Sequence, residues 1–160
     1  MEYKLNRSWA EVNLDHIAHN VREIRRITSP KAEVMGVVKA DAYGHGVMEV
    51  ARTILNNGVS RLAVSMLDEG IQLRKNGIDV PILILSYSDP RRAEEIIENN
   101  LTQPVFSHDL ASALSEAAVR LNKNVKIHIK IDTGMTRVGF MPGYSAIKNV
   151  VEISKLPRIL

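Results

Sequence analysis

Two kinds of apolar pattern alternate along the chain. Short runs dense in apolar residues predict buried strands, and runs with an apolar residue at every third or fourth position predict amphipathic helices. The strands are expected at residues 34–38, 62–66, 82–85, 102–106 and 125–131, although Pro104 weakens the fourth. The helices are expected at residues 14–27, 47–55, 68–76, 90–97, 110–121 and 144–153, and residues 157–160 look like the start of a sixth strand.

Several polar residues mark where these helices should begin. Asn13 is expected to cap the first helix, and the Asp89-Pro90 pair to open a later one. The adjacent acids Asp68 and Glu69 are expected at a helix start, where negative charge complements the helix dipole.

Strands that alternate with helices indicate an α/β protein with a parallel sheet. Two architectures fit this order. One is an open doubly wound sheet, and the other is a (β/α)8 barrel, of which five to six βα units are present in 160 residues. Both place active groups at the carboxyl ends of the strands. Because the loops are short and the composition does not shift, residues 1–160 are expected to form one domain.

Composition and charge narrow the function. The chain is 45% hydrophobic and 24% charged, and its net charge of +3 comes from interspersed residues, so no nucleic-acid partner is expected. No apolar run approaches the roughly 18 residues of a membrane span, and residues 1–9 lack the apolar core of a signal peptide. The sequence has no cysteine, which removes thiol chemistry and fits a cytoplasmic protein.

Lys39 directly follows the apolar run 34–38, and a lysine that extends a buried strand needs a partner or a chemical role. An amine shielded from water is a nucleophile suited to a Schiff base. The alternative is a lysine whose long side chain reaches solvent from the strand end. The following Tyr43-Gly44-His45-Gly46 favours a site, because its glycines permit an unusual backbone path and the Tyr43 hydroxyl could bind a phosphate oxygen.

A second polar cluster lies at residues 128–139. Period two places His128, Lys130 and Asp132 on one strand face, where a lysine in the interior must be paired or modified. Arg137 follows on a loop with glycines, and its planar fork suits a substrate carboxylate. An exposed strand face with a solvated arginine is the alternative. The histidines of the chain show no metal-ligand spacing, so no metal is expected.

Three segments resemble one family. Residues 37–46 (VVKADAYGHG) closely resemble the pyridoxal-phosphate attachment segment of bacterial alanine racemases. Residues 9–15 (WAEVNLD) resemble the opening strand and helix start of that family, and residues 130–139 (KIDTGMTRVG) resemble its second hallmark segment. The three segments lie at the family's spacing, and the first is highly specific.

The resemblance implies a partial (β/α)8 barrel and an enzyme that uses pyridoxal 5′-phosphate to interconvert L- and D-alanine, which supplies D-alanine for peptidoglycan. Lys39 would form the Schiff base with the cofactor and act as one of two bases. Tyr43 would bind the cofactor phosphate, and Leu85 would be an apolar contact at the cofactor.

The resemblance also assigns roles in the second segment. Arg137 would contact both the cofactor and the substrate carboxylate, and Met135 would contact the substrate. Lys130 matches a position that is often carbamylated in this family, where the resulting anion would orient Arg137.

Members of this family are more than twice as long as this chain. By resemblance, the last barrel strands, a C-terminal β domain and the tyrosine that acts as second base across a homodimer interface would lie beyond Leu160. The chain is therefore expected to be a fragment that is inactive alone.

Three other functions compete with alanine racemisation. The first is a serine or broad-specificity racemase. The second is a non-catalytic pyridoxal-phosphate-binding barrel, against which the pair Arg137 and Lys130 argues. The third is an interaction module without a cofactor, against which a lysine in a buried strand argues.

Overall fold

The computed structural model describes residues 8–160. The strands are β1 (Met35–Val37), β2 (Arg61–Val64), β3 (Ile82–Ile84), β4 (Gln103–Val105) and β5 (Ile127–Ile129). The helices are α1 (Leu14–Ile27), α2 (Lys39–Gly44), α3 (Val47–Asn56), α4 (Leu67–Lys75), α5 (Ala93–Glu98), α6 (His108–Arg120) and α7 (Tyr144–Ile153), and the 3-10 turn η1 (Pro90–Arg92) precedes α5.

The predicted order of strands and helices is confirmed, with two differences. The sequence did not predict α2, in which Ala40–Tyr43 have left-handed backbone angles and form the turn that leads out of β1. Residues 8–13 form no strand, so the opening strand expected from the resemblance is wrong for the described part of that segment. Within residues 8–160, no helix has both the length and the apolarity that a bilayer crossing needs.

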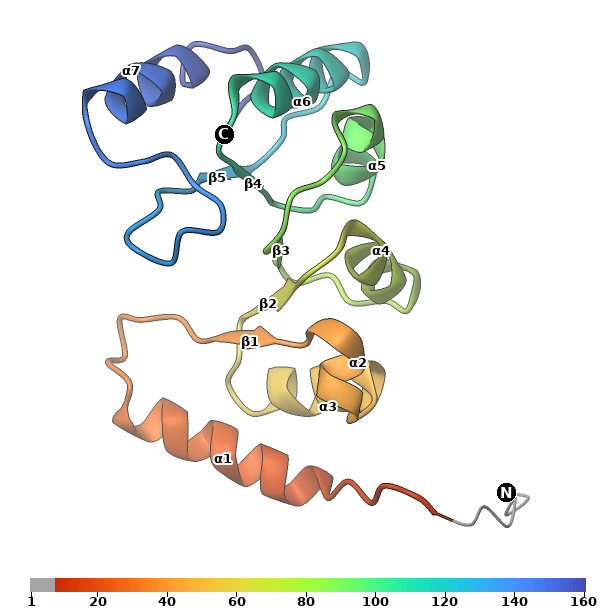
Figure 1. Ribbon diagram of the computed structural model, residues 1–160. Coiled ribbons are helices and arrows are strands. Elements are labelled where there is room, and N and C mark those ends of the chain that lie inside the picture. The colour runs from red at the N-terminus through yellow and green to blue at the C-terminus, as the bar shows by residue number, and fades with distance from the viewer. Residues whose placement is uncertain (1–7) are drawn as a thin grey trace.

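The strands are parallel, and neighbours in sequence are neighbours in space. β1 pairs with β2, β2 with β3 and β4 with β5. Leu83 of β3 bridges to Thr102, which joins the two groups of strands. A doubly wound sheet would instead reverse its strand order and carry helices on both faces. Figure 1 shows the helices α3 to α7 as an outer arc around one side of the strands.

The last residues extend this array. The N–H of Val125 donates to the Arg158 carbonyl, and the N–H of Leu160 donates to the Val125 carbonyl, both at 2.9 Å. The start of a sixth strand at residues 157–160 is therefore confirmed, and it pairs in parallel beside β5.

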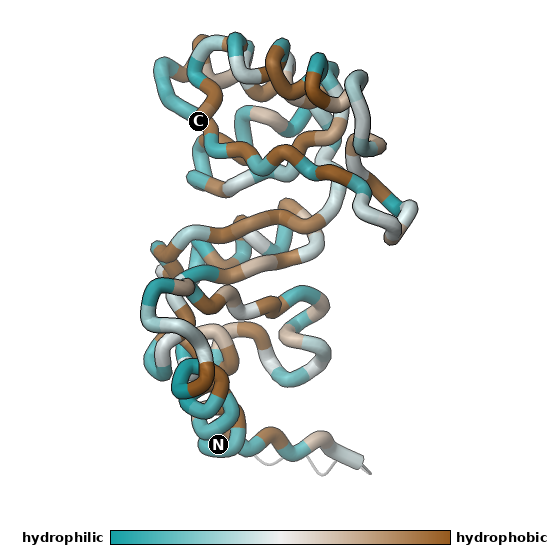
Figure 2. Tube along the Cα trace, turned by 90° about the vertical axis from the view of Figure 1, so that its left-hand side faces the viewer, coloured by the Kyte–Doolittle hydropathy of each residue, from teal (hydrophilic) through white to brown (hydrophobic). Residues whose placement is uncertain are grey.

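The core lies between the strands and the outer helices. Leu62, Ile82 and Ile84 are fully buried there, and each such side chain contributes about 1.5–3 kcal/mol relative to an exposed one. Gly36 lets β1 approach α3 closely, because a Cβ atom at this position would lie 2.4 Å from the Cδ1 atom of Ile54. Figure 2 shows runs of hydrophobic residues along the chain that alternate with hydrophilic ones.

The helix starts are fixed by the polar residues that the sequence suggested. The Asn13 side chain accepts hydrogen bonds from the N–H groups of Asp15 and His16, and the Asp89 side chain accepts one from the N–H of Arg91. Each such cap satisfies backbone donors that the first helical turn leaves open.

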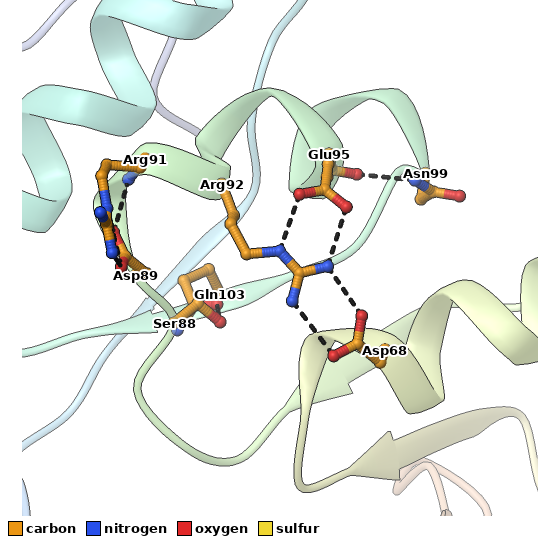
Figure 3. Close-up of polar contacts among 8 residues, drawn as sticks. All are labelled: Asp68, Ser88, Asp89, Arg91, Arg92, Glu95, Asn99 and Gln103. Atoms are coloured by element: carbon orange, nitrogen blue, oxygen red, sulfur yellow. Dashed lines mark hydrogen bonds and ion pairs between the residues drawn. The ribbon is translucent and has the colours of Figure 1, made fainter.

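Arg92 connects the starts of α4 and α5. Its guanidinium donates to both carboxylate oxygens of Glu95 at 2.7 and 2.8 Å and to both of Asp68 at 2.7 and 3.1 Å (Figure 3). Hydrogen bonds from Arg92 lower the pKa of both carboxyl groups. The ion pairs are largely exposed, so they fix geometry more than they add to stability.

Arg74 also connects two segments, at the opposite edge of the strands. From α4 its guanidinium donates to four backbone carbonyls, two in the loop before β3 and two in the loop before β4. The acceptors are the carbonyl oxygens of Ile78 at 2.5 Å, Val80 at 2.8 Å, Asn99 at 2.8 Å and Asn100 at 2.9 Å. One side chain thus holds two successive loops together at the amino ends of their strands.

Replacing Arg74 by methionine should lower the free energy of unfolding by roughly 2–4 kcal/mol. A hydrogen bond to a charged group contributes about 1.5–3 kcal/mol, and water replaces part of the loss at these loops. Urea unfolding followed by circular dichroism measures the effect. Arg91→Met is the control, because the Arg91 side chain is 87% exposed and pairs only with Asp89 among the described residues. Equal unfolding midpoints for the two variants would contradict the role of Arg74.

Candidate functional site

The carboxyl ends of β1, β2 and β3 form one edge of the strand array. Val37, Ala63 and Leu83 are paired across the three strands, so they share a face of the sheet. Leu85 lies two residues beyond Leu83 and continues the ladder, since its N–H donates to the Val64 carbonyl at 2.8 Å. Lys39 lies two residues beyond Val37, so both of these predicted site residues stand at the same edge.

The chain leaves β1 through a left-handed turn. The four residues Ala40–Tyr43 have φ between 50 and 57° and ψ between 36 and 53°, the left-handed helical region. This conformation costs about 1–2 kcal/mol for each residue other than glycine. The sequence placed the unusual backbone path at the glycines near His45, but it begins at Ala40, directly after Lys39. Strain of this kind persists only where surrounding contacts hold it, and it is common at functional sites.

Hydrogen bonds on both sides hold the turn. The N–H of Ala42 donates to the Val38 carbonyl at 3.0 Å. The Asp41 carboxylate accepts from the N–H of Val47 at 2.8 Å, which also caps the start of α3. His45 Nδ1 lies 2.9 Å from the Ala42 carbonyl oxygen. The turn is therefore tied to the strand before it and to the helix after it.

The turn brings Lys39 and Tyr43 together, as the sequence predicted. The Lys39 Nζ atom lies 5.9 Å from the centre of the Tyr43 ring. Lys39 is half-buried, whereas the Tyr43 side chain is exposed. Among residues 8–160, the Lys39 ammonium group makes no hydrogen bond and no ion pair. A primary amine and a phenol hydroxyl are therefore both available to a ligand at this edge.

The alternation predicted along β5 is confirmed. Ile127 and Ile129 pack against the core, and His128 between them is exposed. The N–H of Lys130 donates to the Val105 carbonyl at 2.9 Å, so Lys130 continues the ladder and lies on the face of His128. It stands at the same carboxyl edge of the array as Lys39.

Asp132 shapes the loop that follows. This residue is only 8% exposed, and its Oδ1 atom accepts from the N–H groups of Gly134 at 3.0 Å and Thr136 at 2.9 Å. Hydrogen bonds from Thr136 and Gly134 lower the pKa of the Asp132 carboxyl group, and the charge of Lys130 acts in the same direction. The loop is thus wound around a single carboxylate.

The base of this loop is closed by the main chain. The N–H of Phe140 donates to the Lys130 carbonyl at 2.8 Å, and the N–H of Asp132 donates to the Phe140 carbonyl at 2.9 Å. Gly139 has φ of 137°, and a Cβ atom there would lie 2.5 Å from the Asp132 backbone nitrogen. A residue with a side chain at this position would push the two ends of the loop apart.

The closed loop presents Met135 and Arg137 to solvent. Met135 is 75% exposed, and Arg137 is exposed as well. Within the described part of the chain, the Arg137 guanidinium makes no hydrogen bond and no ion pair. The structure does not bring Arg137 into contact with Lys130 or Lys39, so the predicted site consists of two separate groups on one edge.

Glu69 is a polar residue of this edge whose contacts the sequence did not predict. It was expected to serve the dipole of α4, but its Oε1 atom accepts from the N–H of Ala40 at 2.6 Å. This contact joins residues 29 positions apart in the chain. The acidic pair at a helix start was the available signal, and it indicated only the capping role.

Comparison with known proteins assigns the chain to one family. The family model described as "Alanine racemase, N-terminal domain" matches residues 12–160. This chain belongs to the alanine racemase N-terminal domain family. The family resemblance of its three sequence segments is thereby confirmed.

Relatives within the alanine racemase family are similar along nearly the whole chain. Alanine racemase 1 of Clostridium acetobutylicum is 49% identical over 152 residues, which are 95% of this chain and 39% of that protein. The alanine racemase of Methanococcus maripaludis is 46% identical over 94% of this chain and 40% of its own length. The chain thus spans about two fifths of the curated relatives that it matches.

Solved structures show the same arrangement. The alanine racemase of Clostridium difficile in complex with cycloserine superposes with a TM-score of 0.94 at 40% identity, over 98% of this chain and 43% of that chain. A histidine racemase from Leuconostoc mesenteroides superposes with a TM-score of 0.85 at 31% identity, over 92% of this chain and 39% of its own.

The contribution of Asp132 to the free energy of unfolding should depend on pH in the acid range. Because the folded-state pKa is lowered, ionised Asp132 stabilises the fold above its ordinary pKa of 3.8, and this stabilisation is lost as the pH falls through the folded-state pKa. Asp132→Asn retains an acceptor oxygen but cannot ionise. The difference in unfolding free energy between the wild type and Asp132→Asn should therefore shrink on acidification, as measured by urea titrations at several pH values. A difference independent of pH would contradict this role of the carboxylate.

Proposed function

We propose that this chain is the N-terminal part of a pyridoxal-phosphate-dependent alanine racemase. Its strands would be five to six units of a (β/α)8 barrel. The support for the barrel is the parallel order that follows the chain, together with helices along one side of the strands (Figure 1). The support for the activity is the family and the many relatives named alanine racemase.

The position of Lys39 is the observation that carries the proposal. It is half-buried at the carboxyl edge of β1, and its amine lies 5.9 Å from the ring centre of Tyr43. This donor set fits pyridoxal phosphate: the Lys39 amine would form a Schiff base with the aldehyde, and the Tyr43 hydroxyl would donate to the phosphate. Leu85, at the same edge, would be an apolar contact for the cofactor.

Racemisation needs a base on each face of the substrate α-carbon. When bound, the cofactor would supply an electron sink for the carbanion left after proton removal. The Lys39 amine would take the α-proton from one face of the substrate and return it in the reverse reaction. By family resemblance the second base would be a tyrosine outside these 160 residues, contributed by the partner subunit of a homodimer.

The loop around Asp132 would supply the substrate contacts. The exposed Arg137 guanidinium would bind the substrate carboxylate bidentately and also contact the cofactor, and Met135 would contact the substrate. Lys130 would be carbamylated, which would convert its ammonium into an anion able to pair with Arg137. The closed base of the loop supports these roles, because it fixes where the exposed side chains begin.

Alanine is the proposed substrate, and a cytoplasmic enzyme that supplies D-alanine for peptidoglycan is the proposed context. The similarity to a histidine racemase favours keeping a racemase of another or broader specificity as the second candidate. The features that these racemases share with this chain would then serve the cofactor, and specificity would depend on residues elsewhere in the protein.

Lys39→Ala should abolish cofactor attachment in the complete protein that contains this chain. The wild type should show the absorbance of lysine-bound pyridoxal phosphate near ~420 nm, which requires the Lys39 amine. Lys31→Ala is a matched control, since this lysine is exposed in the loop before β1. Retention of the absorbance band in Lys39→Ala would contradict the assignment of the cofactor to Lys39.

The purified 160-residue chain should not racemise alanine, whereas the complete protein should. The physical reason is that one base can remove a proton but cannot deliver one to the opposite face. Conversion of L-alanine to D-alanine, followed by chiral chromatography with added pyridoxal phosphate, measures both. Turnover by the isolated chain would place the second base within these residues.

A further inference from the structure

The Glu69 carboxylate binds three backbone N–H groups from two separate segments. Its Oε2 atom accepts from Ser65 at 2.7 Å and from Met66 at 2.9 Å, at the end of β2 and the start of α4. Its Oε1 atom accepts from Ala40 at 2.6 Å, directly after Lys39. Glu69 is half-buried, and both oxygens are occupied by backbone donors.

Capping of α4 explains only part of this arrangement. A glutamate at the third helical position accepts from the N–H of the capping residue, which here is Met66. That task needs one oxygen. The bond to Ala40 reaches the left-handed turn that follows β1 and contributes nothing to the start of α4.

The Ala40 bond replaces the next step of the strand ladder. The N–H of Val38 donates to the Ala63 carbonyl at 2.9 Å, so in a continued parallel ladder Ala40 would donate to the Ser65 carbonyl. Its N–H donates to Glu69 instead. The carboxylate therefore accepts from the Ala40 N–H where β1 leaves the sheet, directly after Lys39.

Lys39 is consequently held on both sides. The Val38 N–H before it is bonded to β2, and the Ala40 N–H after it is bonded to Glu69. Ala40 is also the first of the left-handed residues that carry Tyr43 to within 5.9 Å of the Lys39 amine. The path of the backbone at Lys39, and with it the direction of its side chain, depends on these two anchors.

We propose that Glu69 is a positioning residue for Lys39, acting through the Ala40 N–H rather than on any ligand. The proposal rests on the proposed function for the meaning of the Lys39 position, but the contact itself requires no cofactor. Asp68, the preceding residue, instead accepts from Arg92 (Figure 3). The two adjacent acids therefore bind different partners.

Two variants separate the positioning role from capping and charge. Glu69→Asp keeps a carboxylate in the first turn of α4 but is one methylene too short to reach Ala40. Glu69→Gln keeps the length and removes the charge. Glu94→Gln is the matched control, because Glu94 also lies in the first turn of a helix and accepts from a distant residue, Arg120, at 2.9 Å.

The first measurement is hydrogen–deuterium exchange in the cofactor-free complete protein, read on peptides that cover residues 38–46. Loss of a charge-assisted hydrogen bond should speed exchange of the Ala40 amide by at least about tenfold in Glu69→Asp. Exchange in α6 should stay at the wild-type rate in every variant, which shows that the protein remains folded. Wild-type exchange at residues 38–46 in Glu69→Asp would overturn the proposal.

The second measurement is steady-state kinetics of the holoenzyme with alanine. A positioning role predicts that Glu69→Asp lowers kcat by at least about tenfold with little change in KM, because both Glu69 oxygens are bonded to main-chain N–H groups and are not offered to alanine. The circular dichroism of the bound cofactor should also weaken in Glu69→Asp. The control Glu94→Gln should keep the wild-type kcat and the wild-type cofactor signal. Faster exchange at Ala40 with unchanged kcat and cofactor signal would also overturn the proposal.

The two proposals fail in different ways. If the wild type binds no cofactor and turns over no alanine, the proposed function is wrong, and the exchange experiment still decides whether Glu69 holds the backbone at Lys39. If the wild type is active and Glu69→Asp matches it in exchange and in kcat, only the positioning role is wrong.

Discussion

The left-handed turn after β1 is the constraint on which the site depends. Four successive residues other than glycine adopt a conformation that each disfavours by about 1–2 kcal/mol. Hydrogen bonds to three neighbours hold the turn: the β2 ladder before it, the start of α3 after it and the Glu69 carboxylate beside it. A relaxed right-handed path would carry Tyr43 elsewhere, so the pairing of amine and phenol follows from the strain.

The carboxyl edge and the amino edge of the array are built with different bonds. At the carboxyl edge, carboxylates accept from main-chain N–H groups, as Glu69 and Asp132 do. At the amino edge, Arg74 donates to main-chain carbonyls. In these βα units the helices begin near the carboxyl edge and end near the amino edge, so open N–H groups lie at one rim and open carbonyls at the other. Glu69 accepts from such N–H groups at the start of α4, and Arg74 donates to carbonyls just after α5.

Local sequence pattern was enough to predict most of the elements. The strands, the Asn13 cap and the start of a sixth strand at residues 157–160 depend on neighbours a few positions away, and all are confirmed. The alternation of His128 and Lys130 with the isoleucines of β5 was predictable for the same reason. The family resemblance then supplied the roles of site residues, which no periodicity could provide.

The features that escaped prediction depend on distant partners. The left-handed turn contradicts the preference of Ala40, Ala42 and Tyr43, and part of its support comes from a glutamate 29 residues later. The contacts of Arg74 likewise join loops that are adjacent only after the strands have paired. A single sequence carries no local mark of either, because the partners are main-chain groups that nearly every residue possesses: an N–H that donates to Glu69 and carbonyls that accept from Arg74.

Because Arg74 contacts only main-chain atoms, it constrains the loops before β3 and β4 in a particular way. Its four acceptors are the carbonyl oxygens of residues 78, 80, 99 and 100. The guanidinium therefore contacts the backbone of the loops and not their side chains. Substitutions in these loops leave the contacts intact as long as the backbone keeps its course. An inserted or deleted residue moves the carbonyls out of reach at once. The contacts of Arg74 therefore constrain the length of these two loops, whereas burial constrains individual side chains in them such as Ile78.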